Sequence, residues 1–595
     1  MRRVSRPLLV LVAASLAFAA CRPREGSLRV VKHFVAEQWQ AGDDPSMDAV
    51  PSAVSGEERR PILSRTAHAP YDDVYETMPF EVPAGARLRF AVGVADGRWP
   101  PGVVSGFELT AIEDKLEHRL FRRHLAPAER PRDRRWLDRE VDLSAFAGKT
   151  LRLRFEAGQK PAQAATAAPL PFWADPRIVV PGEGPPPRNL IIISLDTLRA
   201  DHLGAYGYPR PTSPTIDSQL AAQGTLFERA YSQFPGTHGS HMSLFTSLYP
   251  CEHGLGAKLG PFVRAHSRAT TLAELLRNAG YATGAYTEDA YVSWLTGFAR
   301  GFDSFVEEKG VGGGPTGQAE KTFGRALGWL RRHARTPGQP SLPWFLFVHT
   351  YQVHYPYTPP AGYVEEVAPD HGEDRASRDA ALYDGEIRYT DDLLARFFAE
   401  LDKLGMSDNT LVVLVSDHGD QFGEHNKWGH GNSLFDGLLH VALIMRGPGL
   451  IPVGKRIPAT VGLIDVLPTM LDLLGLPPGP WMQGQSLVPL LHDRQLTPRT
   501  LYAEVDRYSL VSARRGLLKW IILDGDDPVV KMYNLADDPG EMNDLRPEVA
   551  TAISKQLLDE FHAICAATPP DPAAAGTPRV DGAVQQKLKA LGYVD

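Results

Sequence analysis

Residues 189–195 read Asn189-Leu-Ile-Ile-Ile-Ser-Leu195, and Asp196-Thr-Leu-Arg-Ala-Asp-His follows directly. A continuous apolar run of this length is typical of a strand buried on both faces of a parallel sheet. A Pro/Gly-rich linker, residues 181–188, precedes the run. Because such linkers separate structural units, we expect a new domain to begin near residue 188.

Similar apolar runs recur downstream, at residues 345–348 and 411–415. Helical patterns at residues 271–280 and 319–335 separate them. Alternating strands and helices predict an α/β domain with a doubly wound, mostly parallel sheet over residues 188–497.

Polar side chains follow each of these three strands. They are Asp196 after the first, His349 and His354 after the second, and Asp417 and His418 after the third. Ligands gather at the carboxyl ends of strands in open α/β sheets, so we expect these groups to meet there. Asp196, Asp417 and His418 can hold a metal ion, whereas a single Asp at a strand end is often only a helix cap.

A fourth segment reads Pro235-Gly-Thr237-His-Gly-Ser-His241. Pro and Gly break the chain, so a helix is predicted to begin at Thr237, where free N–H groups favour an anion. A nearby metal ion could activate the Thr237 hydroxyl as a nucleophile. The alternative is that Thr237 only caps the helix. The nucleophile hypothesis requires that Thr237 be accessible and close to the two aspartates.

The rest of the chain divides by composition. Residues 1–21 are predicted to be a signal peptide, with Cys21 as a lipid attachment site of a bacterial lipoprotein, or else to be removed by ordinary signal peptidase cleavage. Residues 22–60 are expected to be a tether, residues 61–180 an all-β, sandwich-like accessory module, and residues 498–595 a small antiparallel α+β subdomain with a hairpin near Gly516. The module could bind glycan or serve only in packing.

The net charge and the cysteine content exclude some classes of partner and of fold. The net charge is −8 and no long basic stripe occurs, so nucleic acid is not an expected partner. Only Cys21, Cys251 and Cys565 occur, which excludes a disulfide scaffold and leaves at most one disulfide if Cys21 carries lipid. Cys251 is expected to be an inert thiol.

Together the motifs resemble those of sulfatase-like hydrolases of the alkaline phosphatase superfamily, in order over about residues 188–545. Residues 196–208 are similar to the opening metal motif of that family, residues 237–250 to its nucleophile motif, and residues 533–545 to its C-terminal signature. Residues 383–389, 417–425 and 428–431 are similar to other blocks of the family. The resemblance implies an ester hydrolase with a metal-dependent site.

One departure concerns the nucleophile. Family members that form formylglycine carry Cys or Ser followed by x-Pro-Ser-Arg, whereas this chain has Thr237, with Gly239 and His241 at the Pro and Arg positions. Threonine cannot become that aldehyde, and the resemblance implies that Thr nucleophiles occur among phosphodiesterases, phosphatases and phosphoglycerol transferases. His418 stands where sulfatases commonly have Asn, which favours Zn²⁺ or Mn²⁺ over Ca²⁺.

The sequence therefore predicts a metal-dependent catalytic site in which each of these side chains has a role. Asp196, Asp417, His418 and the Thr237 oxygen are predicted metal ligands; His354, His430 and His349 are predicted to hold the anion or protonate the leaving oxygen. His241 could support Thr237 or cap its helix, and Arg199 could touch substrate or form a structural ion pair. One metal site is expected, and a second could draw on His349, His354, His430 and Asp384.

The favoured function is an exported, metal-dependent hydrolase or transferase of phosphate or sulfate esters, phosphoesters preferred, in the periplasm or outer envelope and attached to the membrane only by lipid at Cys21. The substrate could include a glycan or a lipid head group. The alternatives are a true sulfuric ester hydrolase of the arylsulfatase type and a non-catalytic, glycan-binding lipoprotein.

Overall fold

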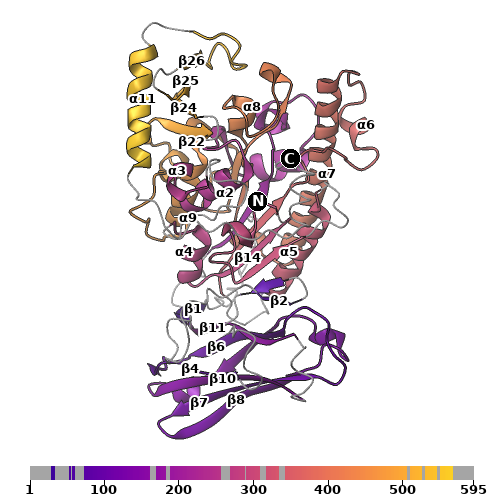
Figure 1. The fold of residues 1–595 in the computed structure, drawn as a ribbon, viewed down its shortest axis with the longest axis vertical. Coiled ribbons are helices and arrows are strands. Elements are labelled where there is room, and N and C mark those ends of the chain that lie inside the picture. Colours follow the sequence, from indigo (N-terminus) through magenta and orange to yellow (C-terminus); the bar gives the residue numbers. More distant parts are fainter. Residues whose placement is uncertain are drawn as a thin grey trace, which may run out of the picture.

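The computed structural model describes residues 28–33, 52–54, 57–59, 73–160, 169–181, 188–255, 269–288, 290–308, 317–333, 342–505, 509–525, 529–545 and 550–566. A β module lies below a larger α/β domain, and helix α11 stands at the side of that domain away from helices α5 and α7 (Figure 1).

The α/β domain is built on a sheet of eleven strands among the described residues, in the order β2-β3-β15-β14-β16-β12-β17-β21-β13-β20, with β22 beside β13. Its centre, β15-β14-β16-β12-β17, is parallel. The strands of this sheet are β2 (Ser52–Val54), β3 (Glu57–Arg59), β12 (Asn189–Leu195), β13 (Thr225–Tyr231), β14 (Ala282–Thr287), β15 (Ser304–Glu307), β16 (Trp344–Thr350), β17 (Thr410–Val415), β20 (His440–Val441), β21 (Leu443–Arg446) and β22 (Lys455–Gly462).

Each face of the sheet packs on its own group of helices, because alternate side chains of β12 point to opposite faces. Leu190 and Ile192 pack toward one set of helices, and Ile191 and Ile193 pack toward the other, all fully buried. The first set is α2 (Thr237–Thr246), α4 (Leu272–Asn278), α9 (Val466–Leu473) and α10 (Val488–Leu491); the second is α5 (Ala319–His333) and α7 (Arg375–Lys403). The predicted doubly wound, mostly parallel α/β fold is confirmed.

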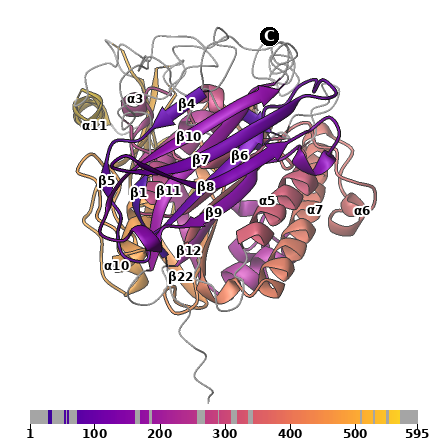
Figure 2. The same ribbon diagram turned by 90° about the horizontal axis from the view of Figure 1, so that it is seen from below.

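The N-terminal module contains two antiparallel sheets, ordered β1-β11-β6-β9 and β4-β10-β7-β8, with β5 beside β10. They enclose one apolar core in which Trp173 is fully buried. The strands are β4 (Asp73–Glu76), β5 (Phe80–Glu81), β6 (Arg87–Val94), β7 (Val104–Glu113), β8 (Leu116–Leu125), β9 (Leu137–Asp142), β10 (Thr150–Lys160) and β11 (Pro171–Pro181). Seen from below, this module lies across the end of the α/β domain (Figure 2), and Arg177 Nη1 donates to Asp303 Oδ2 of that domain at 2.9 Å.

Part of the predicted tether is strand instead. β1 (Leu28–His33) pairs with β11 of the module, and the hairpin of β2 (Ser52–Val54) and β3 (Glu57–Arg59) extends the edge of the central sheet beside β15. The three strands have three to six residues each and no regular alternation of apolar and polar residues, so the sequence pattern did not reveal them. Backbone hydrogen bonds add such an edge strand to a sheet whatever its side chains are. The signal peptide and Cys21 lie outside the described residues.

The C-terminal subdomain is a four-stranded antiparallel sheet followed by a helix, as predicted. Its elements are β23 (Leu501–Val505), β24 (Leu510–Arg515), β25 (Leu518–Leu523), β26 (Val529–Asn534) and α11 (Ala550–Cys565). Gly516, at φ 62°, forms the predicted turn between β24 and β25. The buried cations Arg514 and Lys519 point at Asp436 of the α/β domain, and Lys519 Nζ lies 2.6 Å from Asp436 Oδ1 and 2.5 Å from Glu541 Oε1.

Cys251 is not the inert thiol that the sequence suggested. It forms a disulfide with Cys565, 314 residues later, and so ties helix α3 (Pro250–His253) to α11. This is the one disulfide that the sequence leaves possible if Cys21 carries lipid, and it joins two parts of the chain that meet only when the C-terminal subdomain folds onto the main one. Among the described residues, no helix is both long and apolar enough to cross a membrane.

Candidate active site

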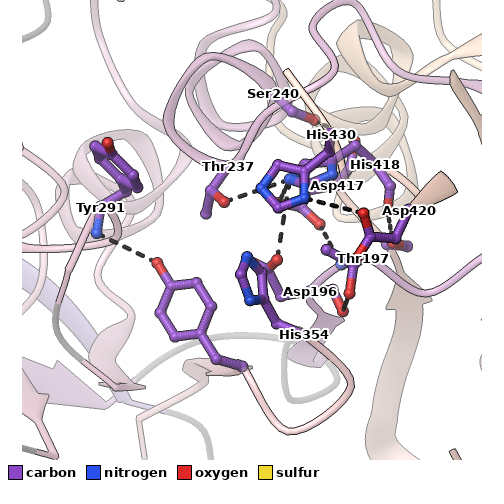
Figure 3. A network of polar contacts seen from close by, with 12 residues as sticks. Asp196, Thr197, Thr237, Ser240, Tyr291, His354, Asp417, His418, Asp420 and His430 are labelled. Carbon is purple, nitrogen blue, oxygen red and sulfur yellow. Dashed lines mark hydrogen bonds and ion pairs between the residues drawn. The ribbon is translucent and has the colours of Figure 1, made fainter. Parts of the chain in front are cut away.

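Three neighbouring strands deliver the predicted site residues to one edge of the sheet. In β12 and β16, Ser194 pairs with His349 and Leu195 with Thr350, and on the other side Ser194 pairs with Val415 of β17. Asp196, His349 and Asp417 therefore lie together at the carboxyl ends of the strands, and Figure 3 shows Asp196 and Asp417 next to each other. This is the convergence that the sequence predicts.

Asp196, Asp417 and His418 form the one group among the described residues whose ligand atoms lie close enough together for a metal ion, all within 4.8 Å of one another. His418 Nε2 is 3.3 Å from Asp417 Oδ2 and 3.9 Å from Asp196 Oδ1. These two carboxylate oxygens are buried and accept no hydrogen bond from the described residues. Two orphaned carboxylate oxygens and one imidazole nitrogen fit a divalent cation of the Zn²⁺ or Mn²⁺ type.

Burial also sets the charge of these ligands. Burial, together with the nearby charge of Asp417, raises the pKa of Asp196 well above its usual range. Burial lowers the pKa of His418 to about 4, so its imidazole is neutral near pH 7 and can offer a lone pair. Nδ1 of this ring lies 2.8 Å from the Gly419 carbonyl, which directs Nε2 toward the aspartates.

Thr237 is the first residue of α2, and Gly236 in extended conformation is its N-cap. The capping alternative for Thr237 is therefore wrong. Its Oγ1 lies 3.4 Å from His418 Nε2, beside the candidate metal group (Figure 3). Contrary to the expectation that it be accessible, Thr237 has no exposed surface. Thr237 thus has the neighbours predicted for a nucleophile but not the predicted exposure.

His241 lies one turn further along α2 and is fully buried. Its Nδ1 is 2.8 Å from the Thr237 carbonyl and 3.5 Å from Asp417 Oδ2, and its Nε2 is 2.8 Å from Ser194 Oγ. No side chain caps the start of α2, and the contact of His241 with Thr237 is to the carbonyl oxygen, so support of the Thr237 hydroxyl by His241 stays a prediction. These contacts also leave the ring no surface to offer a substrate.

Three further histidines surround the group. His349 Nε2 lies 3.1 Å from Asp196 Oδ2, and the His430 ring centroid is 4.6 Å from that of His418 and 4.8 Å from that of His354. Burial lowers the pKa of His354 to about 3, so this ring is neutral near pH 7. All three lie where the sequence places them, and their catalytic roles stay predictions.

Arg199 forms a structural ion pair rather than facing the site. Its guanidinium is 8% exposed and donates to Asp201, to Glu424 and to the Asp420 carbonyl. Every donor group of this side chain is thereby occupied, so the predicted substrate contact is not supported.

The suggested second metal site is also not assembled. Asp384 is fully buried, but His202 Nδ1, the Tyr208 hydroxyl and Arg210 Nη1 each lie 2.7 Å from its oxygens. Its carboxylate is therefore occupied by other side chains, which the sequence gave no sign of bringing together.

Three residues at the site were not assigned a role from sequence. Asp420 Oδ1 lies 3.3 Å from His430 Nδ1, and the Tyr357 hydroxyl donates to Asp420 Oδ2 at 2.5 Å. His238, next to Thr237, stacks on Tyr291. Asp420 could have been found, because it lies in the same four-residue motif as Asp417 and His418; nothing in the sequence pointed to Tyr357 or His238.

Comparison with known proteins agrees with this geometry. A family model described as Sulfatase matches residues 188–476, and one described as N-sulphoglucosamine sulphohydrolase, C-terminal, matches residues 423–566. The chain belongs to the alkaline phosphatase/sulfatase superfamily. It is thus a hydrolase that acts on ester bonds, as its motifs suggested.

Individual superfamily members show how far the likeness extends. An arylsulfatase of Clostridium perfringens is 25% identical over 449 residues, which are 60% of this chain and 90% of that protein. A choline-sulfatase of Rhizobium meliloti is 32% identical over 201 residues, 33% of this chain and 38% of that protein. This sulfatase-superfamily chain thus spans nearly the whole of one relative and little more than a third of the other.

Solved structures show the same superfamily fold. A phosphonate monoester hydrolase of Agrobacterium radiobacter superposes with a TM-score of 0.52 at 21% identity, covering 64% of this chain and 95% of that one. A protein solved with its substrate D-glucosamine-2-N,6-O-disulfate gives 0.53 at 19% identity, covering 65% and 99%. The likeness establishes the fold and leaves the substrate to be argued from the site.

Proposed function

We propose that the protein is an exported, metal-dependent hydrolase or transferase that cleaves phosphate or sulfate esters through Thr237, with phosphoesters preferred. The observation that carries the proposal is the Thr237 hydroxyl at the start of α2, 3.4 Å from His418 Nε2 and beside the Asp196–Asp417–His418 group. Hydroxyl nucleophiles need such an activating neighbour.

Asp196, Asp417 and His418 would hold the cation. When bound, it would lower the pKa of the Thr237 hydroxyl and offset negative charge that develops on the ester oxygens. Asp196 Oδ1 and Asp417 Oδ2, which accept no hydrogen bond from the described residues, are the oxygens that would bind it.

Thr237 and His430 have separate roles in the proposed reaction. The Thr237 oxygen attacks phosphorus or sulfur as the bond to the leaving oxygen breaks. The main-chain N–H groups at the start of α2 point toward the developing charge and stabilise it; one such donor contributes about 3 kcal/mol. His430, oriented by Asp420, is placed to protonate the leaving oxygen. Water then hydrolyses the Thr237 ester and frees the hydroxyl.

Access is part of the proposal, because Thr237 and the three candidate metal ligands are at most 1% exposed. His238 and His430 are the partly exposed members of this neighbourhood. We infer that the anionic group enters between them and that side chains above Thr237 shift to admit it.

The choice between phosphate and sulfate rests on two opposing observations. Threonine cannot provide the formylglycine chemistry of the sulfatases that the motif resembles, which favours phosphoesters. The similar proteins named arylsulfatase and choline-sulfatase favour sulfate, so a sulfuric ester hydrolase is the second candidate.

Export is supported by the Cys251–Cys565 disulfide, since disulfides persist in oxidising compartments. We propose a location in the periplasm or outer envelope, with lipid at Cys21 as the attachment. Mass spectrometry of the mature N-terminus tests the lipid.

The central experiment measures turnover of an aryl phosphate monoester, a diester and an aryl sulfate by protein loaded with Mn²⁺, Zn²⁺ or Ca²⁺. We expect Thr237→Ala to lower kcat by at least about 10³-fold and Thr237→Ser to retain part of the activity. Thr246→Ala, at the other end of α2, is the matched control and should stay near the wild-type rate. Turnover that survives Thr237→Ala refutes the nucleophile, and failure to cleave any ester favours a binding function for the module.

A further inference from the structure

At the candidate site, solvent exposure differs between two consecutive residues, Thr237 and His238. Thr237, Asp196, Asp417 and His418 are at most 1% exposed, whereas His238, the residue after the proposed nucleophile, is partly exposed. An anionic ester group can enter the buried cluster, but the organic part of the substrate is too large to follow. Because the proposed entry lies between His238 and His430, that part stays outside the buried cluster, next to the His238 ring.

Neighbouring rings fix the orientation of His238. Its ring stacks on Tyr291 with a centroid separation of 4.9 Å and an interplanar angle of 28°, and it meets Phe234 edge-on at 5.4 Å. Phe234 in turn packs so closely on α2 that a Cβ at Gly236 or Gly239 would lie 2.9 or 2.6 Å from its ring atoms. The His238 ring is thereby held between two buried aromatic side chains.

Hydrogen bonds to the backbone N–H and carbonyl of Tyr291 fix the position of this residue. Its N–H donates to the Tyr351 hydroxyl at 3.2 Å, as Figure 3 shows, and its carbonyl accepts from Thr296 Oγ1 at 2.8 Å. Tyr291 is 3% exposed, so it serves as a backing for His238 rather than as a surface of its own. A partly exposed ring on a fixed backing is a preorganised flat wall.

We propose that the His238 ring, backed by Tyr291, contacts the organic group of the substrate and selects esters whose leaving group carries a ring with a flat apolar face. Flat rings stack on an aromatic wall through dispersion and quadrupole contacts that an acyclic chain cannot match. Aryl groups and sugar rings share this chemistry. The inference rests on the proposed function and names a substrate class for the same site.

The test compares kcat/KM of the variant with that of the wild type for a ring substrate and for its acyclic partner. The intrinsic reactivity of each substrate cancels in this ratio. The metal-loaded enzyme is assayed on a phenyl ester and an acyclic alkyl ester of the same acid, and separately on glucose 6-phosphate and glycerol phosphate or their sulfate counterparts. We expect His238→Ala to lower kcat/KM for the ring substrate about threefold to tenfold more than for its acyclic partner. His238→Phe, which keeps a flat ring, should keep the preference. A change in the phenyl pair alone assigns the wall to aryl groups, and a change in the sugar pair alone assigns it to glycans.

The matched control is His333→Ala, because His333 also stacks on an aromatic residue, Trp329, at 3.9 Å, but beside the amino end of β16. It should leave the ratio unchanged. Equal effects of His238→Ala on ring and acyclic substrates overturn the inference while the proposed function stands. If the wild-type protein cleaves no ester, both are overturned. Binding of phenylphosphonate and ethylphosphonate to Thr237→Ala, with and without His238→Ala, checks the preference without turnover.

Discussion

Asp196 has no exposed surface and faces a second carboxylate, Asp417, across the candidate metal group. Two buried carboxylates this close together repel each other when both are ionised, so the metal-free protein retains a proton on Asp196 at a higher pH than an ordinary aspartate would. A cation removes that repulsion but must first displace the proton.

Metal affinity should therefore depend on pH. Since the pKa of Asp196 is raised, the affinity for Mn²⁺ or Zn²⁺ should rise with pH and weaken about tenfold for each unit below that pKa. Calorimetric titration between pH 5 and pH 8 measures this slope. Asp196→Asn should abolish tight binding, and an affinity that does not vary with pH would contradict the assignment.

The sequence predicted those site residues that belong to a contiguous motif. It missed residues that matter only because of side chains brought next to them by the fold. Thr237, Asp417 and His418 could be located because Pro/Gly breaks or buried strands precede them. His238 could not, since its importance comes from Tyr291, more than 50 residues away along the chain. The burial of Thr237 was likewise invisible, because it depends on side chains from several elements.

Among the elements, α2 depends on an unusually close approach to Phe234. A Cβ added at Gly239 would lie 2.6 Å from the Phe234 ring and 2.9 Å from the Leu255 carbonyl. Neither neighbour can move without shifting the first turn of α2, which carries Thr237.

Gly239→Ala should therefore destabilise the protein by roughly 1–3 kcal/mol and lower kcat through displacement of Thr237. The control is Gly324→Ala in the middle of α5, where a Cβ meets nothing within 4 Å and should stabilise by about 1 kcal/mol through helix propensity. Thermal unfolding and turnover of both variants test this. Wild-type kcat in Gly239→Ala would show that α2 tolerates the shift.

Elements with a strong apolar period were predicted nearly to their ends. The predicted strand at 189–195 coincides with β12, and the predicted helix at 319–335 with α5 up to His333. The short strands β1 to β3 were taken for a tether, because they join sheets by their backbone and carry no clear apolar period. Helix α7, 29 residues long, was recognised only as a family block at residues 383–389.

For the whole molecule, the contact between the α/β domain and the C-terminal sheet contains buried charge. Lys519 has no exposed side-chain surface, and its ammonium is shared by Asp436 and Glu541. Removing one partner of such a cluster leaves the others desolvated and unpaired, which costs about 3–5 kcal/mol.

Lys519→Ala should accordingly lower the melting temperature by roughly 5 °C. Arg87→Ala, which breaks the part-exposed ion pair with Glu140 in the module, is the control and should cost no more than about 1 kcal/mol. Differential scanning calorimetry compares the two. Equal, small effects would mean that the C-terminal sheet contributes little to the stability of the α/β domain.

The disulfide between Cys251 and Cys565 closes the intervening chain into a covalent loop. This loop includes β16, β17 and α7. A protease that nicks this loop once cannot release a fragment: the two pieces migrate as a single band on a gel until a reductant is added. The segment that contains Asp417, His418 and His430 would thus stay joined to the Thr237 segment after a cut, so a single cut need not separate the parts of the site.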